Sequence, residues 1–114
     1  MRAEVLEALK ALSDREYQER EWGKYQEAVC RYDDLALNVH ILYDDCRVLP
    51  DPSSQVGSVL FPEDVDYLRR VDAVLGPLID QLGRSPDAEY LADPRWDLVV
   101  DAAAEALSHL ARRM

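Results

Sequence analysis

Hydrophobic residues recur along most of this chain at steps of three and four, and no segment alternates with the period of two that a strand requires. The first segment with the helical spacing carries Val5, Leu6, Leu9 and Leu12. It predicts a short first helix. Ser13-Asp-Arg-Glu16 then has the form of a capping box, which predicts a second short helix ending near Trp22-Gly23.

The segment from about 25 to 45 has apolar residues on two sides. One face carries Tyr25, Val29, Tyr32, Ala36, Val39 and Tyr43. At about 100° per residue, Cys30, Leu37 and Ile41 lie on a separate face more than about 90° away. A helix that is apolar on two sides is normally packed on two sides, so we predict that 25–45 is the central helix of a bundle.

Loop residues follow, and then two longer helical patterns. Pro50, Pro52 and Gly57 predict a loop between Val48 and Val59. The next helix begins near Pro62 and ends at Gly83, and Gly76-Pro77 predicts a kink or a break within it. Its expected buried stripe is Phe61, Leu68, Val71, Leu75, Leu78, Ile79 and Leu82.

A helical turn over 87–92 and a last helix complete the pattern. Asp93-Pro94 has the form of an N-cap followed by a first helical residue. The last helix is expected to bury Trp96, Val99, Val100, Ala103, Leu107 and Leu110. Trp96 is expected in the core, whereas Trp22 could lie in the core or on an exposed aromatic patch. The chain as a whole predicts an all-α fold, a compact single domain over 1–114 with four to five helices.

Charge narrows the classes of partner. The 114 residues include 23 acids against 13 lysines and arginines, a net charge of −10. Residues 33–105 alone hold 16 acids and five bases. Nucleic acid and anionic membrane surfaces both require clustered positive charge, so neither is expected as a ligand. No stretch has the roughly 18 apolar residues of a membrane span, and no secretory signal is recognisable, so we expect a cytoplasmic protein.

The two cysteines support the same compartment. If one helix joins Cys30 to Cys46, the two lie about 24 Å apart at ~1.5 Å per residue. A disulfide requires Cα atoms within about 7 Å, so the pair cannot bridge. Two thiols that cannot pair fit a reducing compartment.

One group of residues has the chemistry of a metal or acid–base site. On the predicted central helix Asp33, His40 and Asp44 fall within about 40° of one another. Such a strip could hold a divalent metal or supply a base near neutral pH. The simpler interpretation is that His40 bonds to Asp44 and the pair closes a seam between helices. No complete catalytic constellation accompanies these residues, and no cofactor is expected.

Two acidic groups are candidates for binding a partner. Asp44 and Asp45 lie at the end of the predicted central helix, where negative charge is unfavourable to the helix dipole. Asp97, Asp101 and Glu105 form a stripe along the last helix. Either group can be a solvated face, or it can dock a basic partner, because opposite charge accelerates association.

Three blocks of sequence carry a resemblance. They are His40-Ile-Leu-Tyr43-Asp44-Asp45, Val56-Gly57-Ser-Val-Leu60, and Tyr90-Leu-Ala-Asp-Pro94-Arg-Trp96-Asp-Leu-Val99-Val-Asp-Ala102. With them, residues 33–110 resemble a group of small acidic helical proteins of actinobacterial type whose function is uncharacterised. Some of these chains look like immunity proteins of bacterial toxin systems. The resemblance implies no catalytic residue.

Three functions are therefore expected, in order of preference. The first is a non-enzymatic acidic module that binds a basic protein, as an immunity or antitoxin-type inhibitor binds a toxin. The second is a small metal-dependent hydrolase or a ligand-binding bundle that uses Asp33, His40 and Asp44. The third is a homodimer that associates through Cys30, Leu37 and Ile41.

Overall fold

The computed structural model describes residues 2–24 and 32–112, and within these ranges it contains helices, turns and no strand. The helices are α1 (Arg2–Ser13), α2 (Arg15–Glu21), α3 (Leu35–His40), α4 (Val65–Leu82), α5 (Asp87–Ala92) and α6 (Trp96–Ala111). Three short turns join them: the π-helical η2 (Ile41–Asp45) and the 3-10 helices η3 (Pro52–Gln55) and η4 (Pro62–Asp64). The prediction of an all-α fold is confirmed, with six α-helices in the described residues rather than four or five.

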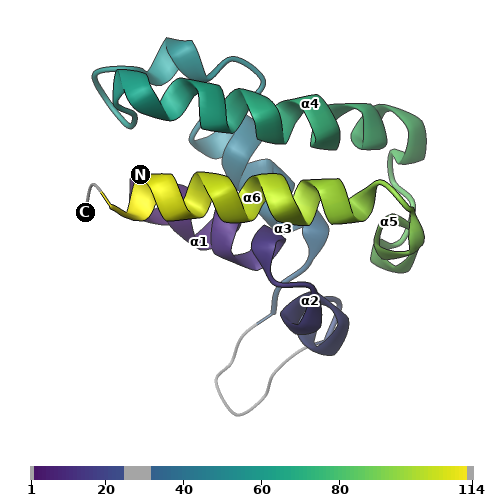
Figure 1. Cartoon of the computed structure of the whole chain (residues 1–114). Coiled ribbons are helices and arrows are strands. Elements are labelled where there is room, and N and C mark those ends of the chain that lie inside the picture. The colour runs from purple at the N-terminus through teal and green to yellow at the C-terminus, as the bar shows by residue number, and fades with distance from the viewer. Residues whose placement is uncertain (1, 25–31, 113–114) are drawn as a thin grey trace.

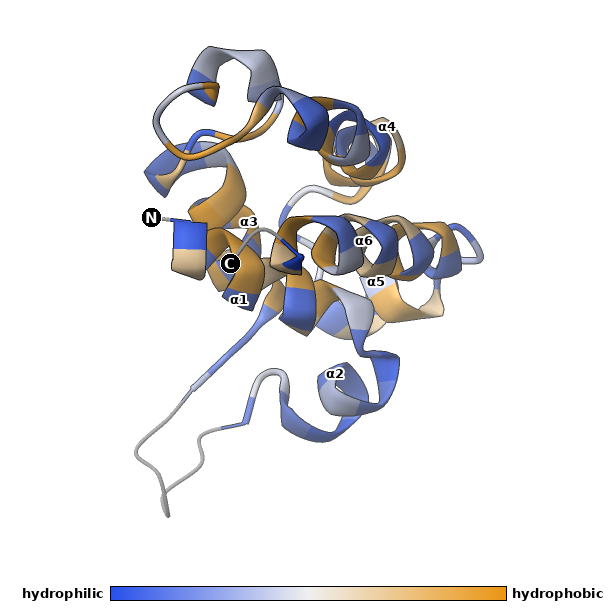
Figure 2. Cartoon of the chain, turned by 60° about the vertical axis from the view of Figure 1, so that its left-hand side comes forward, coloured by the Kyte–Doolittle hydropathy of each residue, from blue (hydrophilic) through white to orange (hydrophobic). Residues whose placement is uncertain are grey.

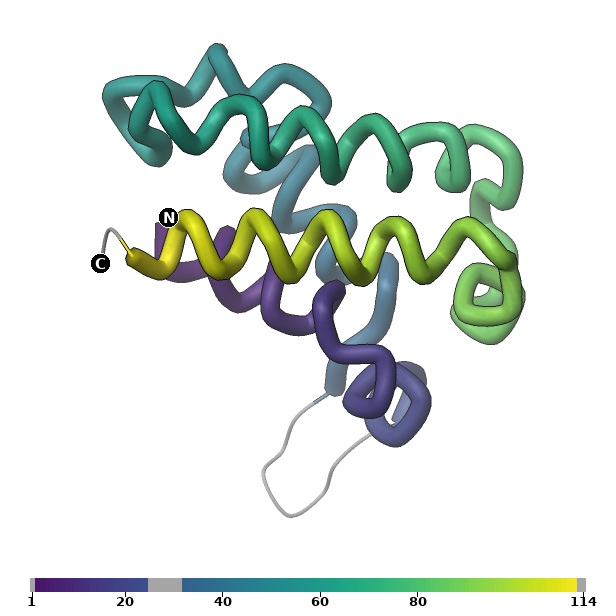
Figure 3. The backbone as a smooth tube through the Cα atoms, in the orientation of Figure 1, coloured from purple at the N-terminus to yellow at the C-terminus, as the bar shows by residue number. Residues whose placement is uncertain are grey.

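The helix at the centre of the fold is α6. It packs against α1 on one side and α4 on the other, while α3 and η2 pack against α1 (Figure 1). The backbone trace shows α3 crossing behind the layer formed by α4, α6 and α1 (Figure 3). Ala103 and Ala106 of α6 are fully buried, and their small side chains allow neighbouring helices to approach closely. The prediction that the segment 25–45 is the central helix is therefore wrong.

That segment is also less helical than expected. Among the described residues its helix begins only at Leu35, because Asp34 adopts an extended backbone and its side chain accepts a hydrogen bond from the Leu37 N–H. The predicted positions Tyr25, Val29 and Cys30 lie outside the described residues. Leu37, placed on a packed face by its spacing, is 44% exposed.

The true buried stripe of this segment contains a polar residue. It consists of Leu35, Asn38, Leu42 and Cys46, and all four are almost completely buried. The Asn38 amide donates to a carboxylate oxygen of Asp33 and to the carbonyl of Asp34, which makes its burial tolerable. A pattern search for apolar residues passes over Asn38 and so selects the wrong faces.

The predictions for the second half are mostly confirmed. The stripe Leu68, Val71, Leu75 and Leu78 is buried, although Phe61 is exposed. Helix α4 runs unbroken through Pro77, so a break there is not observed. Gly83 ends it with φ +53°, a conformation that a residue with a Cβ adopts only with strain.

Two helix starts are displaced from their predicted positions. Asp14, not Ser13, caps α2, because its carboxylate accepts from the Tyr17 N–H at 3.0 Å. Helix α6 begins at Trp96 rather than at Pro94. The Asp93 carboxylate binds the backbone and the guanidinium of Arg95, and this local pairing holds 93–95 in a turn.

The core is built around an aromatic pair. Trp22 and Trp96 meet edge to face with ring centroids 6.1 Å apart, and both are buried. The prediction that Trp96 lies in the core is confirmed, and Trp22 lies there as well. Buried Gln18 accepts from the Trp96 indole N–H and donates to two carbonyls at the end of α1. Figure 2 shows apolar and hydrophilic positions mixed along α1, α4 and α6, whereas α2 is mostly hydrophilic.

Within the described ranges, no helix has both the length and the apolar character that crossing a membrane requires.

Candidate functional site

Asp33 is a structural carboxylate rather than part of a metal site. It is buried between α2 and α3 and accepts hydrogen bonds from the Tyr17 hydroxyl at 2.8 Å and the Trp22 indole at 3.2 Å. The Asn38 amide and the Asp34 N–H complete the set, both at 2.9 Å. With four donors directed at it, the carboxylate joins α2 to the start of α3.

Among the described residues, the ionic contacts of His40 are with its own segment. Its Nδ1 lies 2.8 Å from Asp44 and its Nε2 lies 3.3 Å from Asp45, and all three side chains are exposed. The proposed trio of Asp33, His40 and Asp44 is not brought together, because the helix that would align them begins after Asp33. No group of three metal-binding side chains occurs within 2–24 and 32–112.

The acidic stripe of α6 is partly neutralised by the chain itself. The Arg15 guanidinium lies 2.8 Å from Asp97, and Arg70 lies 3.6 Å from Glu105. Asp101 between them is exposed. Two of the three predicted partner-binding acids on this helix therefore already have an arginine beside them.

The two acids at the end of η2, Asp44 and Asp45, have a different setting. Among the described residues no lysine or arginine pairs with Asp44 or Asp45, whose only ionic neighbour is His40. The two predicted acidic groups therefore differ. In the α6 group Asp97 and Glu105 each have an arginine beside them, whereas Asp44 and Asp45 have none among the described residues.

A groove opens beside Asp44, between α3–η2 and the C-terminal half of α4. It consists of two adjoining hollows of about 460 and 660 Å³ that share Val39, Asp44 and Ile79. We call it the α3–α4 groove. Its apolar lining includes Ala36, Val39, Ala73, Pro77 and Ile79. We call these apolar lining residues the floor of the groove and its charged lining residues the rim. The groove exists because α3 packs on α1 while α4 packs on α6, which leaves the two helices apart on this side.

The rim of the α3–α4 groove is acidic. Its carboxylates are Asp44, Asp72, Asp80 and Asp87, and its cationic side chains are Arg84 and, when protonated, His40. Asp87 accepts from the Leu35 N–H at 3.2 Å, and burial together with nearby Asp34 and Asp33 raises its pKa. Asp72, Asp80 and Asp87 were not identified from the sequence, since they are spread over two helices and no local pattern groups them with Asp44.

One hydrogen bond joins the two sides of the larger hollow. The Tyr43 hydroxyl donates to Oδ1 of Asp72 at 2.7 Å. Burial, followed by the Asp72 carboxylate, raises the pKa of Tyr43 strongly. Gly76 leaves room for this arrangement, because a Cβ at that position would lie 3.1 Å from the same oxygen of Asp72.

A second buried carboxylate, Asp64, was also missed. Its Oδ2 accepts from Arg2 and from the Phe61 N–H, both at 2.8 Å, and His109 Nε2 lies 3.4 Å from its Oδ1. Arg2 also donates to the carbonyl of Leu110 at 3.0 Å. The cluster joins the start of α1 to η4 and the end of α6. The sequence carries no signal for it, because its members come from the two ends and the middle of the chain.

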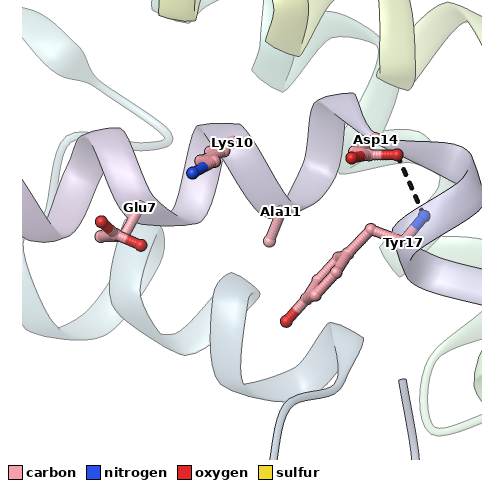
Figure 4. Close-up of a pocket in the computed structure, with 5 residues that line it drawn as sticks. All are labelled: Glu7, Lys10, Ala11, Asp14 and Tyr17. Atoms are coloured by element: carbon pink, nitrogen blue, oxygen red, sulfur yellow. Dashed lines mark hydrogen bonds between the residues drawn. The ribbon is translucent and has the colours of Figure 1, made fainter. Parts of the chain in front are cut away.

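Another hollow is less suited to bind a partner. The hollow of about 160 Å³ where α1 meets α2 is small, and its lining includes Lys10 as well as Glu7 and Asp14 (Figure 4).

The predicted self-association face has Leu37 exposed and Ile41 half-buried, while Cys30 lies outside the described residues. A homodimer through this face stays a prediction.

Comparison with known proteins places the chain in a family without assigning it an activity. Residues 1–113 match the family model described as a domain of unknown function, DUF7945. No curated protein and no solved structure matches the chain. Since the family model covers almost the whole sequence, the chain belongs to the DUF7945 family.

Proposed function

We propose that this protein is a non-enzymatic binding module that docks on a basic partner protein, in the manner of an immunity or antitoxin-type inhibitor. The observation that carries the proposal is the contrast between its two acidic surfaces. Arginines of the same chain neutralise much of the α6 stripe. Asp44, in contrast, lines the α3–α4 groove, Asp45 follows it, and among the described residues both have only His40 as ionic neighbour.

Charge supports a basic partner over other classes. The net charge of −10 repels nucleic acid and anionic lipid, and it attracts a cationic surface from a distance. An inhibitor of this kind would cover the cationic nucleic-acid-binding groove of a toxin with its own carboxylates. The small acidic helical proteins that residues 33–110 resemble, some of them immunity-like, support the same class of function.

The proposal is tested by affinity purification from the source organism at low and at moderate salt. The wild-type protein should retain a basic protein that the double variant Asp44→Asn, Asp45→Asn retains poorly. The matched control is Asp97→Asn with Asp101→Asn, which removes the same charge from α6 and should retain the partner as the wild type does.

Two results would refute the proposal. One is the recovery of no basic partner from the wild type at either salt concentration. The other is loss of the partner from the α6 variant while the Asp44 and Asp45 variant keeps it, because the acidic surface would then be the wrong one. Far-ultraviolet circular dichroism of each variant checks that folding is unchanged.

A further inference from the structure

We infer that the α3–α4 groove receives apolar side chains from a basic, amphipathic segment of the partner protein. The inference rests on the proposed function and specifies which surface binds and which kind of segment it binds. It commits to a segment in which leucine-like side chains are interspersed with lysine or arginine.

The floor of the groove provides the apolar half of this match. Val39 and Ile79 are half-buried and line both hollows, so each packs on the core with one side and leaves the other open. Ala36, Ala73 and Pro77 are exposed around them and have short or compact side chains. Small residues around two larger apolar ones leave space for side chains of a partner. Apolar side chains of binding partners commonly fill pockets of this kind.

The rim provides the charged half. Asp44, Asp72, Asp80 and Asp87 come from three different segments and line the same groove. In the part of the chain that the structure describes, Arg84 is the one permanently cationic side chain lining it. Tyr43 uses Oδ1 of Asp72, so a cation from the partner would meet Oδ2. An apolar floor with an acidic rim is complementary to a basic amphipathic segment, as in other helix-in-groove recognition.

The same features disfavour other occupants. A second copy of this chain also carries a net charge of −10 and would bring carboxylates toward carboxylates. A purely cationic segment would leave the apolar floor exposed to water. Neither occupant uses both halves of the groove.

The test uses the whole protein and two synthetic peptides of equal length and equal charge. In the first peptide leucine and lysine recur at helical spacing, and in the second every leucine is replaced by serine. Calorimetric titration should give binding of the leucine peptide more than about tenfold tighter than that of the serine peptide. Methyl signals of Val39 and Ile79 should shift on addition of the leucine peptide in a two-dimensional NMR spectrum.

A matched pair of variants locates the site. Ala73→Arg places a cation over the floor of the groove, and Ala104→Arg places the same cation on an exposed position of α6. We expect Ala73→Arg to weaken the leucine peptide about tenfold or more and Ala104→Arg to change it by less than about twofold. If Ala73→Arg does not fold, Ala36→Arg makes the same test from the opposite side of the groove.

Each remaining outcome overturns the inference. Equal binding of the two peptides would show that charge alone is recognised, and the proposed function would still stand. Methyl shifts elsewhere, or equal effects of the two variants, would place the peptide on another surface. If neither peptide binds, the groove does not take such a segment, and the affinity purification then decides separately whether a basic partner exists.

Discussion

The Tyr43 hydroxyl donates a 2.7 Å hydrogen bond to Asp72, and this bond joins η2 to the middle of α4. The two residues are 29 positions apart, on segments that otherwise pack on different neighbours. The bond therefore sets the spacing between the two walls of the α3–α4 groove. Both residues line the larger hollow of this groove.

Removing this bond should destabilise the fold modestly. Tyr43→Phe keeps the ring and loses the hydroxyl, so we expect the free energy of unfolding to fall by about 1 kcal/mol, the usual worth of one partly buried hydrogen bond. Urea denaturation measures the change. Tyr32→Phe is the control, because Tyr32 also donates to a carboxylate, Asp34, but is exposed, and we expect almost no change. If both variants lower the free energy of unfolding equally, the Tyr43–Asp72 hydrogen bond does not stabilise the fold as we expect.

Alkaline pH should weaken the fold through Tyr43. Because the pKa of Tyr43 is raised in the folded protein, folding favours its neutral form. That stabilisation is complete below the ordinary tyrosine pKa of about 10 and is lost as pH rises above it. The stability of the wild type should therefore fall more steeply than that of Tyr43→Phe between about pH 9 and 11. Parallel curves for the two proteins would rule out Tyr43 as the cause.

The Asp64 cluster should matter more for stability. Asp64→Asn keeps the shape but leaves Arg2, whose side chain is 19% exposed, beside a neutral amide. Breaking one side of a buried ion pair typically costs about 3 kcal/mol. The control is Asp66→Asn, an exposed carboxylate in the first turn of α4 that lies 4.0 Å from Arg69. Thermal or urea unfolding that shows no difference between these variants would mean that the cluster contributes little.

Two opposite substitutions on α3 test which of its residues is buried, polar Asn38 or apolar Leu37. Asn38→Leu makes the buried stripe fully apolar, yet it removes the donor to buried Asp33, so we expect a loss of about 1–3 kcal/mol. Leu37→Asn places a polar residue at an exposed position and should stay within about 0.5 kcal/mol. The account fails here if Asn38→Leu is the more stable of the two variants.

Sequence reasoning succeeded where the buried residues are uniformly apolar. The stripes of α1, α4 and α6 follow the 3.6-residue period without polar members, so most of their positions could be predicted. The exceptions include exposed Phe61, the buried Ala106 that was not predicted, and four predicted positions that are only half-buried: Ile79, Leu82, Val100 and Leu107. It failed on 25–45, because buried Asn38 interrupts the apolar pattern and the Asp34 cap starts the helix late. The starts of α2 and α6 also differ from the prediction, because Asp14 rather than Ser13 caps α2 and because Asp93 pairs with Arg95 before α6.

The candidate site was predicted only in part. Asp44 and Asp45 were identified because adjacent acids at a helix end are visible in the sequence. Asp72, Asp80 and Asp87 were not, since what brings them to one groove is the packing of α4 on α6 and of α3 on α1. The arginine partners of Asp97 and Glu105 come from α2 and α4, and no local pattern reveals pairs so distant in sequence.

Carbodiimide cross-linking of the complex with the basic partner, followed by mass spectrometry, tests the central claim most directly. This reagent joins a carboxylate to a lysine only when the two are in ion-pair contact. We expect cross-links from Asp44, Asp45 and Asp80 to lysines of the partner. Cross-links confined to Asp97, Asp101 and Glu105 would contradict the account, because the partner would then be bound by α6 and not at the α3–α4 groove.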